Sequence, residues 1–397
     1  MKKTIAAVLI MLFALAACGG GGNSSYENSG VGAIAGDIRS FANWGANLCA
    51  TEDTVYFICG DLADQQLRYM DKATGIGGPL CGKPECQHND IDCNAYLNGW
   101  VCGLTIYDGR LYWVEDDSSL AKMPIYSVAL DGTGRRIVRE MDRDIIGSSK
   151  KCSLIQIHDG VLYWAYSPSR LENGESKAYI RMVAFPLDSD EKGYVIMDEE
   201  NKLSGQYFQP NGDNIYIAFV NAPEWPDMTE FEYILYRWDI KTKQLEKLYT
   251  GAAPTDNIIG LWPEEDGLVI LGYNYSTYHK ESETGWKVIK YGFETGEFEI
   301  QYEDISIESA SAAIADGLFV KIWEKETNEF VLLVRDFEGN IVLNETIPGV
   351  KSQNVNFGFS FRGFDDDYFY FYTVMPERII VIPRDGSELR YIWTDAE

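Results

Sequence analysis

Asp108-Gly109-Arg110-Leu111-Tyr112-Trp113 and, 51 residues later, Asp159-Gly160-Val161-Leu162-Tyr163-Trp164 repeat one phrase, a tight turn followed by an aromatic run rich in strand-forming residues. Five further copies begin at Asp53, Asp213, Asp266, Asp316 and Asp366. The steps from one copy to the next are 55, 51, 54, 53, 50 and 50 residues. Gly and Asn in these turns supply the positive φ that a tight hairpin requires, so each copy predicts a β-hairpin.

A period near 50 residues with several strands in each unit is typical of a β-propeller. Each turn follows an apolar strand, as at residues 154–157, and a second hairpin follows in every unit, as at residues 125–132. Four strands form one blade. The sequence therefore predicts an all-β fold, a seven-bladed β-propeller of four-stranded blades that takes up residues 31–397 as one domain. The alternative is a pair of β-sandwiches, which the even spacing of the copies disfavours.

The N-terminal residues have the pattern of an export signal. Two lysines precede an apolar run at residues 5–15, which is too short to span a bilayer and ends in Leu15-Ala16-Ala17-Cys18. This ending resembles the lipobox of bacterial lipoproteins, which implies cleavage before Cys18 and a diacylglyceryl group on its sulfur. An ordinary signal peptide is the alternative. We expect a lipoprotein signal peptide at residues 1–17 and a flexible linker at residues 18–30. The lipid would anchor the protein to the extracytoplasmic face of the cell membrane.

The chain is strongly acidic. It has 34 Lys and Arg against 61 Asp and Glu, a formal net charge of −27 at pH 7. Such a charge repels phosphate backbones and anionic headgroups, so nucleic acid is not expected as a partner.

A cysteine-rich insertion at residues 80–100 separates the first two units. Cys81, Cys86, His88 and Cys93 follow the pattern C-x4-C-x-H-x4-C, and three thiolates with one imidazole complete a tetrahedral zinc shell. Disulfides are the ordinary expectation for an exported chain, and unpaired thiols are the third alternative. Once Cys18 carries lipid, an odd number of cysteines remains, which cannot all pair: Cys49, Cys59, Cys81, Cys86, Cys93, Cys102 and Cys152. In every case the role is structural, because a closed four-ligand site has no open position for catalysis.

In outline the chain resembles the TolB-like and YWTD-like propellers. It resembles more closely a group of uncharacterised lipoproteins of Gram-positive bacteria, which share the Asp-Gly-x-Leu-Tyr-Trp phrase and the cysteine insertion. The resemblance covers nearly the whole mature chain. It implies a fold and a location but no activity, because that group has no assigned activity.

The loops of a propeller suggest where a ligand would bind. The loop between the second and third strands of a blade and the loop to the next blade emerge on one face, so that face receives the insertion and residues 221–227 and 273–279. Exposed aromatic rings beside polar groups suit sugar or peptide binding. The candidate ligand-binding residues are Trp225, Tyr273, Tyr275, Tyr278 and His279. The alternative is that these rings pack between blades.

One acidic stretch partly meets a calcium-loop pattern. Asp188-Ser189-Asp190-Glu191-Lys192-Gly193 with Glu199 supplies several ligand positions, but Lys192 occupies one where an oxygen belongs. We therefore expect this stretch to be the tip of a hairpin.

The preferred function is a non-catalytic binding or protein-interaction module whose ligand is a glycan, a peptide or an envelope protein. Only three histidines are present, which weakens any triad, and no catalytic residue is assigned. No cofactor is required beyond a possible structural zinc. The alternatives are a polysaccharide hydrolase or lyase that uses paired carboxylates, and a structural platform in an envelope complex.

Overall fold

The computed structural model describes residues 48–60, 65–98, 100–116, 122–142, 155–200, 206–221, 231–275, 285–304, 310–325, 327, 329–351, 359–374, 377–385 and 390–394. All of them belong to the unit Ala33–Glu397. The predicted signal peptide, Cys18 and the linker lie outside these residues. In the described ranges no helix has the length and hydropathy that crossing a membrane requires.

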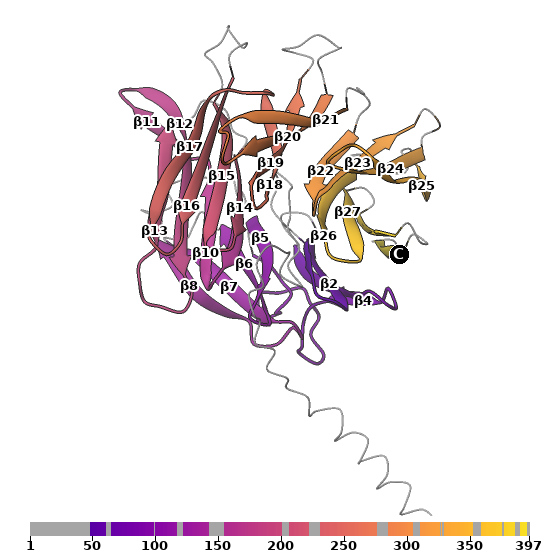
Figure 1. Ribbon diagram of the computed structural model, residues 1–397. Helices are drawn as coiled ribbons and strands as arrows, with labels where there is room; N and C mark the ends of the chain where they lie inside the picture. The colour runs from indigo at the N-terminus through magenta and orange to yellow at the C-terminus, as the bar shows by residue number, and fades with distance from the viewer. Residues whose placement is uncertain are drawn as a thin grey trace, which may run out of the picture. The chain divides into compact units, whose positions relative to one another are not determined.

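The described strands form seven antiparallel sheets, each built from consecutive strands, which confirms the predicted seven-bladed β-propeller (Figure 1). The first three blades comprise β1 (Leu48–Ala50), β2 (Thr54–Cys59), β3 (Gln66–Asp71) and β4 (Gly77–Pro79); β5 (Trp100–Tyr107), β6 (Arg110–Asp116), β7 (Lys122–Ala129) and β8 (Arg136–Asp142); and β9 (Ile155–His158), β10 (Val161–Tyr166), β11 (Ser169–Glu172), β12 (Glu175–Pro186) and β13 (Tyr194–Glu200). The next two comprise β14 (Gln206–Asn211), β15 (Asn214–Asn221), β16 (Glu232–Asp239) and β17 (Gln244–Ala252); and β18 (Asn257–Pro263), β19 (Gly267–Asn274), β20 (Gly285–Gly292) and β21 (Phe298–Asp304). The last two comprise β22 (Ala310–Ala315), β23 (Leu318–Glu324), β24 (Glu329–Asp336) and β25 (Ile341–Lys351); and β26 (Phe359–Phe364), β27 (Tyr368–Val374), β28 (Glu377–Pro383) and β29 (Arg390–Thr394).

The repeated phrase joins the first and second strands of each blade. In the second blade Asp108 and Gly109 both have positive φ, 46° and 69°, the geometry of a two-residue hairpin turn. The fourth blade differs from expectation, because Gly212 and not Asn214 takes the positive φ; Asn214 is already the first residue of β15. In the fifth blade Gly267 instead allows the neighbouring strand to lie close to it, since a Cβ there would collide with the carbonyl of Tyr291.

The core lies between the blades. Successive side chains of a strand point to opposite faces of its sheet, so each blade packs against both neighbours. One buried cluster joins Leu162 and Trp164 of the third blade to Val114 and Ile125 of the second. Most of the aromatic phrase is therefore core, as Trp113 and Trp164 show with 1% of their surface exposed.

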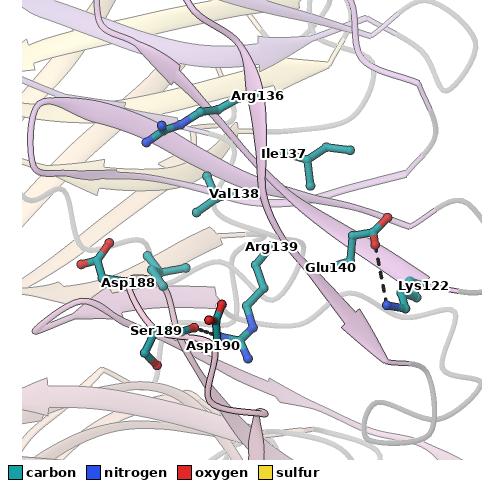
Figure 2. Close-up of a pocket in the computed structure, with 10 residues that line it drawn as sticks. Lys122, Arg136, Ile137, Val138, Arg139, Glu140, Asp188, Ser189 and Asp190 are labelled. Atoms are coloured by element: carbon teal, nitrogen blue, oxygen red, sulfur yellow. Dashed lines mark hydrogen bonds and ion pairs between the residues drawn. The ribbon is translucent and has the colours of Figure 1, made fainter.

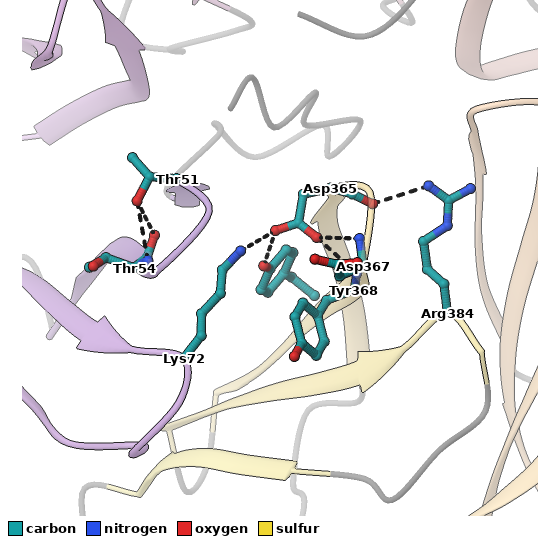
Figure 3. Close-up of polar contacts among 8 residues, drawn as sticks. Thr51, Thr54, Lys72, Asp365, Asp367, Tyr368 and Arg384 are labelled. Atoms are coloured by element: carbon teal, nitrogen blue, oxygen red, sulfur yellow. Dashed lines mark hydrogen bonds and ion pairs between the residues drawn. The ribbon is translucent and has the colours of Figure 1, made fainter. Parts of the chain in front are cut away.

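The ring closes by direct contact of the first and seventh blades. The innermost strands β1 and β26 lie against each other, and both blades keep four strands of their own in the described residues. Lys72, in the turn after β3, forms an ion pair with Asp365, in the turn after β26 (Figure 3). The Tyr370 hydroxyl donates to the same carboxylate. Whether residues 31–46 add a closing strand lies outside the described residues.

The third blade has a fifth strand that the sequence analysis missed. β12 is 12 residues long and outruns β10, and its first four residues pair with β11 instead. Asn173 and Gly174 form the turn between them, both with positive φ. The result is a projecting hairpin, labelled β11 and β12 in Figure 1.

Candidate functional site

The structure brings the four predicted metal ligands together. One ligand atom from each of Cys81, Cys86, His88 and Cys93 lies within 4.8 Å of the others. His88 Nδ1 is 3.4 Å from Cys93 Sγ. Zinc bonds to thiolate and imidazole imply about 3.6 Å between such a nitrogen and sulfur in a tetrahedral shell, and about 3.8 Å between two sulfurs. The donor set and the distance between His88 and Cys93 therefore fit zinc.

The backbone of the insertion aims these side chains inward. Glu85 and His88 adopt positive φ, 63° and 58°, which turns the chain back on itself between the ligands. The Ala95 N–H donates to Cys93 Sγ at 3.3 Å, as suits a metal-bound thiolate.

The pKa values of two of these thiols are shifted in opposite directions. Burial raises the pKa of Cys93 to about 12. Burial also acts to raise the pKa of Cys81, but backbone hydrogen bonds from Lys83 and Asn94 outweigh it and lower that pKa. A bound cation would favour the thiolate at every ligand position, because it supplies the missing positive charge.

The disulfide alternative is not observed at this site. Cys81, Cys86 and Cys93 are free thiols in the structure. Cys49 and Cys59 are buried in the first blade. Of the remaining two cysteines, the side chain of Cys102 and all of Cys152 lie outside what the structure describes.

The insertion bridges the first and second blades. On one side the Leu67 N–H, at the start of β3, donates to the carbonyl of Ala95 at 2.8 Å. On the other side Gly82 N and Asn94 Nδ2 both donate to the carbonyl of Gly132, at 3.0 and 2.7 Å. Gly132 lies in the turn between β7 and β8. A metal held by the insertion would therefore fasten two blades.

Arg135 completes this junction. Its guanidinium donates to the backbone carbonyls of Cys93, at 3.3 Å, and of Tyr96. It also forms an ion pair with the buried Glu115 at 2.8 Å and lies over the Tyr126 ring, 4.7 Å from its centre. This role could not be predicted from the sequence, because the contacted carbonyls lie 42 and 39 residues away along the chain.

Two of the predicted ligand-binding aromatics meet on the fifth blade. The rings of Tyr273 and Tyr275 are 5.0 Å apart and edge to face, and Tyr273 also lies 4.5 Å from Trp286. Trp286 is buried, whereas Tyr275 keeps 43% of its surface exposed. Trp225, Tyr278 and His279 lie outside the described residues.

Tyr275 is held from three directions. Asn257 Nδ2 donates to its hydroxyl at 3.0 Å, and the Tyr275 N–H donates to Asp256 Oδ2 at 2.9 Å. The Asp256 N–H donates in turn to Asn274 Oδ1 at 3.1 Å, and both residues are buried. The exposed ring is therefore fixed by a polar network beneath it and by the edge of Tyr273.

The acidic stretch is a hairpin tip, as expected. Residues 188–193 connect β12 to β13, whereas Glu199 points to the fourth blade and accepts the Tyr236 hydroxyl hydrogen. A shallow pocket of about 580 Å³ lies between this turn and strand β8 (Figure 2). Arg139 crosses it and donates to the carbonyl of Ser189 at 2.9 Å. Arg139 thus ties the second blade to the third.

The histidines do not form a catalytic group in the described part of the chain. His88 belongs to the metal cluster. His158 Nε2 lies 2.8 Å from the carbonyl of Gly212, and a carbonyl only accepts, so this nitrogen carries the proton.

Comparison with known proteins supports the fold. No family model and no curated protein matches the chain. A prolyl endopeptidase structure is 12% identical, with a TM-score of 0.55 over 91% of this chain and 51% of that chain. The β-propeller domain of the Trilobed protease from Pyrococcus furiosus, described as having an open velcro topology, is 12% identical, with a TM-score of 0.50 over 91% of this chain and 97% of that chain. TolB from Acinetobacter baumannii is 11% identical, with a TM-score of 0.40 over 75% of this chain and 65% of that chain.

The likenesses to the prolyl endopeptidase and to the Trilobed protease domain show a β-propeller fold shared with peptidases. The chain spans about half the length of the prolyl endopeptidase. The activity of that whole enzyme is therefore a separate matter from the shared fold.

Proposed function

We propose that this protein is a membrane-anchored, extracytoplasmic binding module that engages a glycan, a peptide or another envelope protein through the face that carries Tyr275. The observation that supports this most directly is the fixed, exposed Tyr275 ring. A ring that is already ordered loses little conformational entropy when a ligand stacks on it. Sugar faces and proline or aromatic side chains are the groups that stack on such a ring.

The location of this module follows from its N-terminal residues. A diacylated Cys18 would hold the protein on the membrane, and the Gly-rich linker would let the propeller reach ligands beside it. The net charge of −27 suits a partner that is neutral or basic. The cluster of Cys81, Cys86, His88 and Cys93 supports the propeller and takes no part in ligand binding.

The experiment measures binding by the full-length protein in detergent, using a glycan array and a panel of envelope peptides and proteins. Tyr275→Ala is expected to weaken the wild-type interaction about tenfold or more, the effect of losing one central aromatic contact. Tyr69→Ala, at a tyrosine of β3 that is 36% exposed, is the matched control and should leave binding unchanged. No binding by the wild type, or equal loss in both variants, would contradict the proposal.

Hydrolysis is the second candidate, because the fold is shared with a peptidase. The same incubations can report it through release of reducing ends or cleaved peptides. Turnover that survives Tyr275→Ala would favour a hydrolase or lyase with paired carboxylates. A stoichiometric partner that co-purifies without any small ligand would favour the structural platform.

A further inference from the structure

Arg362 lies on β26, the innermost strand of the seventh blade. Pairing with β27 shifts register between Phe361 and Gly363, so Arg362 occupies a β-bulge, a feature that redirects a side chain. Its side chain is half-buried and stacks on Tyr372, with the guanidinium carbon 4.9 Å from the ring centre. The residue as a whole therefore keeps part of its surface exposed.

This arginine differs from the other half-buried arginines of the described chain. The described chain has ten half-buried arginines, Arg362 included. The other nine donate hydrogen bonds to a protein acceptor: Arg68, Arg110, Arg135, Arg139, Arg170, Arg181, Arg237, Arg335 and Arg384. Among the described residues Arg362 has only its ring contact. A guanidinium has five N–H donors, and no acceptor for those of Arg362 is found among the described residues.

No carboxylate in the described part of the chain forms an ion pair with Arg362. Desolvation by burial lowers the pKa of Arg362, whereas a carboxylate beside it would have raised that pKa. A guanidinium nevertheless stays protonated in proteins. The chain has 61 acidic side chains, yet in the described residues none pairs with this cation.

The surrounding junction does not supply the missing charge. Tyr372 follows Tyr370 on the same face of β27, and Tyr370 donates to Asp365. The Asp365 carboxylate already forms an ion pair with Lys72 (Figure 3). The junction of the seventh and first blades thus holds two half-buried or buried cations and one carboxylate among its described residues.

We propose that Arg362 is an anion-binding site at the junction of the seventh and first blades, which takes the carboxylate or phosphate group of a small ligand. The planar fork of the guanidinium can donate hydrogen bonds to two oxygens of such a group side by side, and stacking on the Tyr372 ring fixes the plane of the guanidinium. The site is distinct from the Tyr275 face, which is built from β18 and β19 of the fifth blade.

The test uses the purified full-length protein and two probes, inorganic phosphate and acetate, each titrated at constant ionic strength against chloride. Thermal unfolding followed by tryptophan fluorescence should show a saturable rise in Tm with at least one probe, because a ligand of the native state stabilises it. The probe that acts identifies the group that the site takes. No saturable rise with either probe would overturn the proposal.

Variants locate the effect. Arg362→Gln should weaken the response at least tenfold, and Arg362→Lys should keep part of it, because it retains the charge without the fork. Arg237→Gln is the control, since Arg237 already pairs with Glu246 on the fourth blade and its loss should leave the response intact. An undiminished response in Arg362→Gln would also overturn the proposal. For each variant, the Tm with the probe is compared with the Tm without it. A variant that is less stable without the probe can therefore still be compared with the wild type.

Discussion

Arg135 shows how one side chain can hold an insertion to the fold. Its guanidinium reaches two carbonyls of the insertion and the carboxylate of Glu115, whose side chain is 3% exposed. Trp113 Nε1 donates to the same carboxylate at 2.8 Å. A charge so deeply buried is costly unless several donors surround it. Arg135 is therefore more important than an ordinary surface arginine.

We predict that Arg135→Met destabilises the protein by about 3 kcal/mol, the typical cost of removing one partner of a buried ion pair. Chemical denaturation followed by fluorescence measures the change. Arg136→Met, at the exposed neighbouring residue, is the control and should change stability by less than about 0.5 kcal/mol. Equal effects of the two substitutions would show that Arg135 does not carry this junction.

At the residue scale the sequence predicted that four candidate metal ligands would lie together, and it missed the residue that supports them. Cys81, Cys86, His88 and Cys93 are close in the chain, so their spacing alone indicates a cluster. Arg135 reaches the cluster only because the turn after β7 folds back onto the insertion. Asn257 and Asp256 were missed for a similar reason, since each meets Tyr275 across a pair of strands.

Among the elements, the β11–β12 hairpin is an addition to the regular blade. Asp198 of β13 accepts hydrogen bonds from Arg170, at 2.6 Å, and from Arg181. Arg170 lies over the Tyr179 ring, 4.2 Å from its centre. These contacts fix the base of the hairpin, while Leu171 near its tip is 77% exposed. The Asn173-Gly174 dipeptide is typical of a hairpin turn and could have predicted this one. It was missed because the extra hairpin does not belong to the four-stranded unit that repeats about every 50 residues.

We predict that the hairpin loosens as pH falls. Burial acts to raise the pKa of Asp198, but the hydrogen bonds from Arg181 and Arg170 outweigh it and lower that pKa. A carboxyl whose folded pKa lies below its unfolded value, about 3.9, stabilises above that value and loses its contribution as pH falls through the folded pKa. Near neutral pH the Asp198 carboxyl stays ionised, so hydrogen exchange of residues 169–178 should show no opening of the hairpin caused by its protonation. Below about pH 4 the exchange should report that the hairpin opens.

The variant Asp198→Asn should show the same opening at neutral pH, because it removes the charge that both arginines contact. Lys177 of the hairpin pairs with Glu200 of β13 at 2.9 Å, and Glu200→Gln is the matched control at a more exposed pair. Exchange in the hairpin that Asp198→Asn leaves unchanged would contradict the assignment.

The seven described blades form a ring that closes without a shared strand among these residues, so the junction of the first and last blades depends on side chains. Lys72 and Asp365 meet there with 7% and 15% of their side chains exposed. Arg384 extends the contact, donating to the Asp365 carbonyl at 3.1 Å and to Asp316 of the sixth blade at 3.0 Å. Polar turns at one end of the blades thus reinforce the apolar packing between them.

We predict that Lys72→Met destabilises the protein by about 3 kcal/mol or more, because the Asp365 carboxylate keeps its burial and loses its cation. Urea denaturation measures the change. Lys241→Met is the control, since Lys241 pairs with Asp213 at 71% and 54% exposure and such a pair contributes less than about 1 kcal/mol. A loss no larger than the control's would mean that the junction does not depend on this pair.

At this scale the sequence predicted most of the architecture. Seven copies of one phrase indicated the number of blades, because a four-stranded unit cannot bury both faces alone. How the ring closes was left open, and the answer depends on contacts such as that of Lys72 with Asp365, 293 residues apart. No periodicity reports a contact between the two ends of a repeat array.

Cys81, Cys86, His88 and Cys93 form a group that could hold a metal ion, and we propose that zinc bound there fastens the first two blades. The most direct test is a crystal structure with anomalous data on both sides of the zinc absorption edge. We predict one zinc peak about 2.3 Å from the sulfurs of Cys81, Cys86 and Cys93 and about 2.1 Å from a ring nitrogen of His88. A disulfide between any two of these cysteines, or full-length protein with no zinc peak there, would contradict the account.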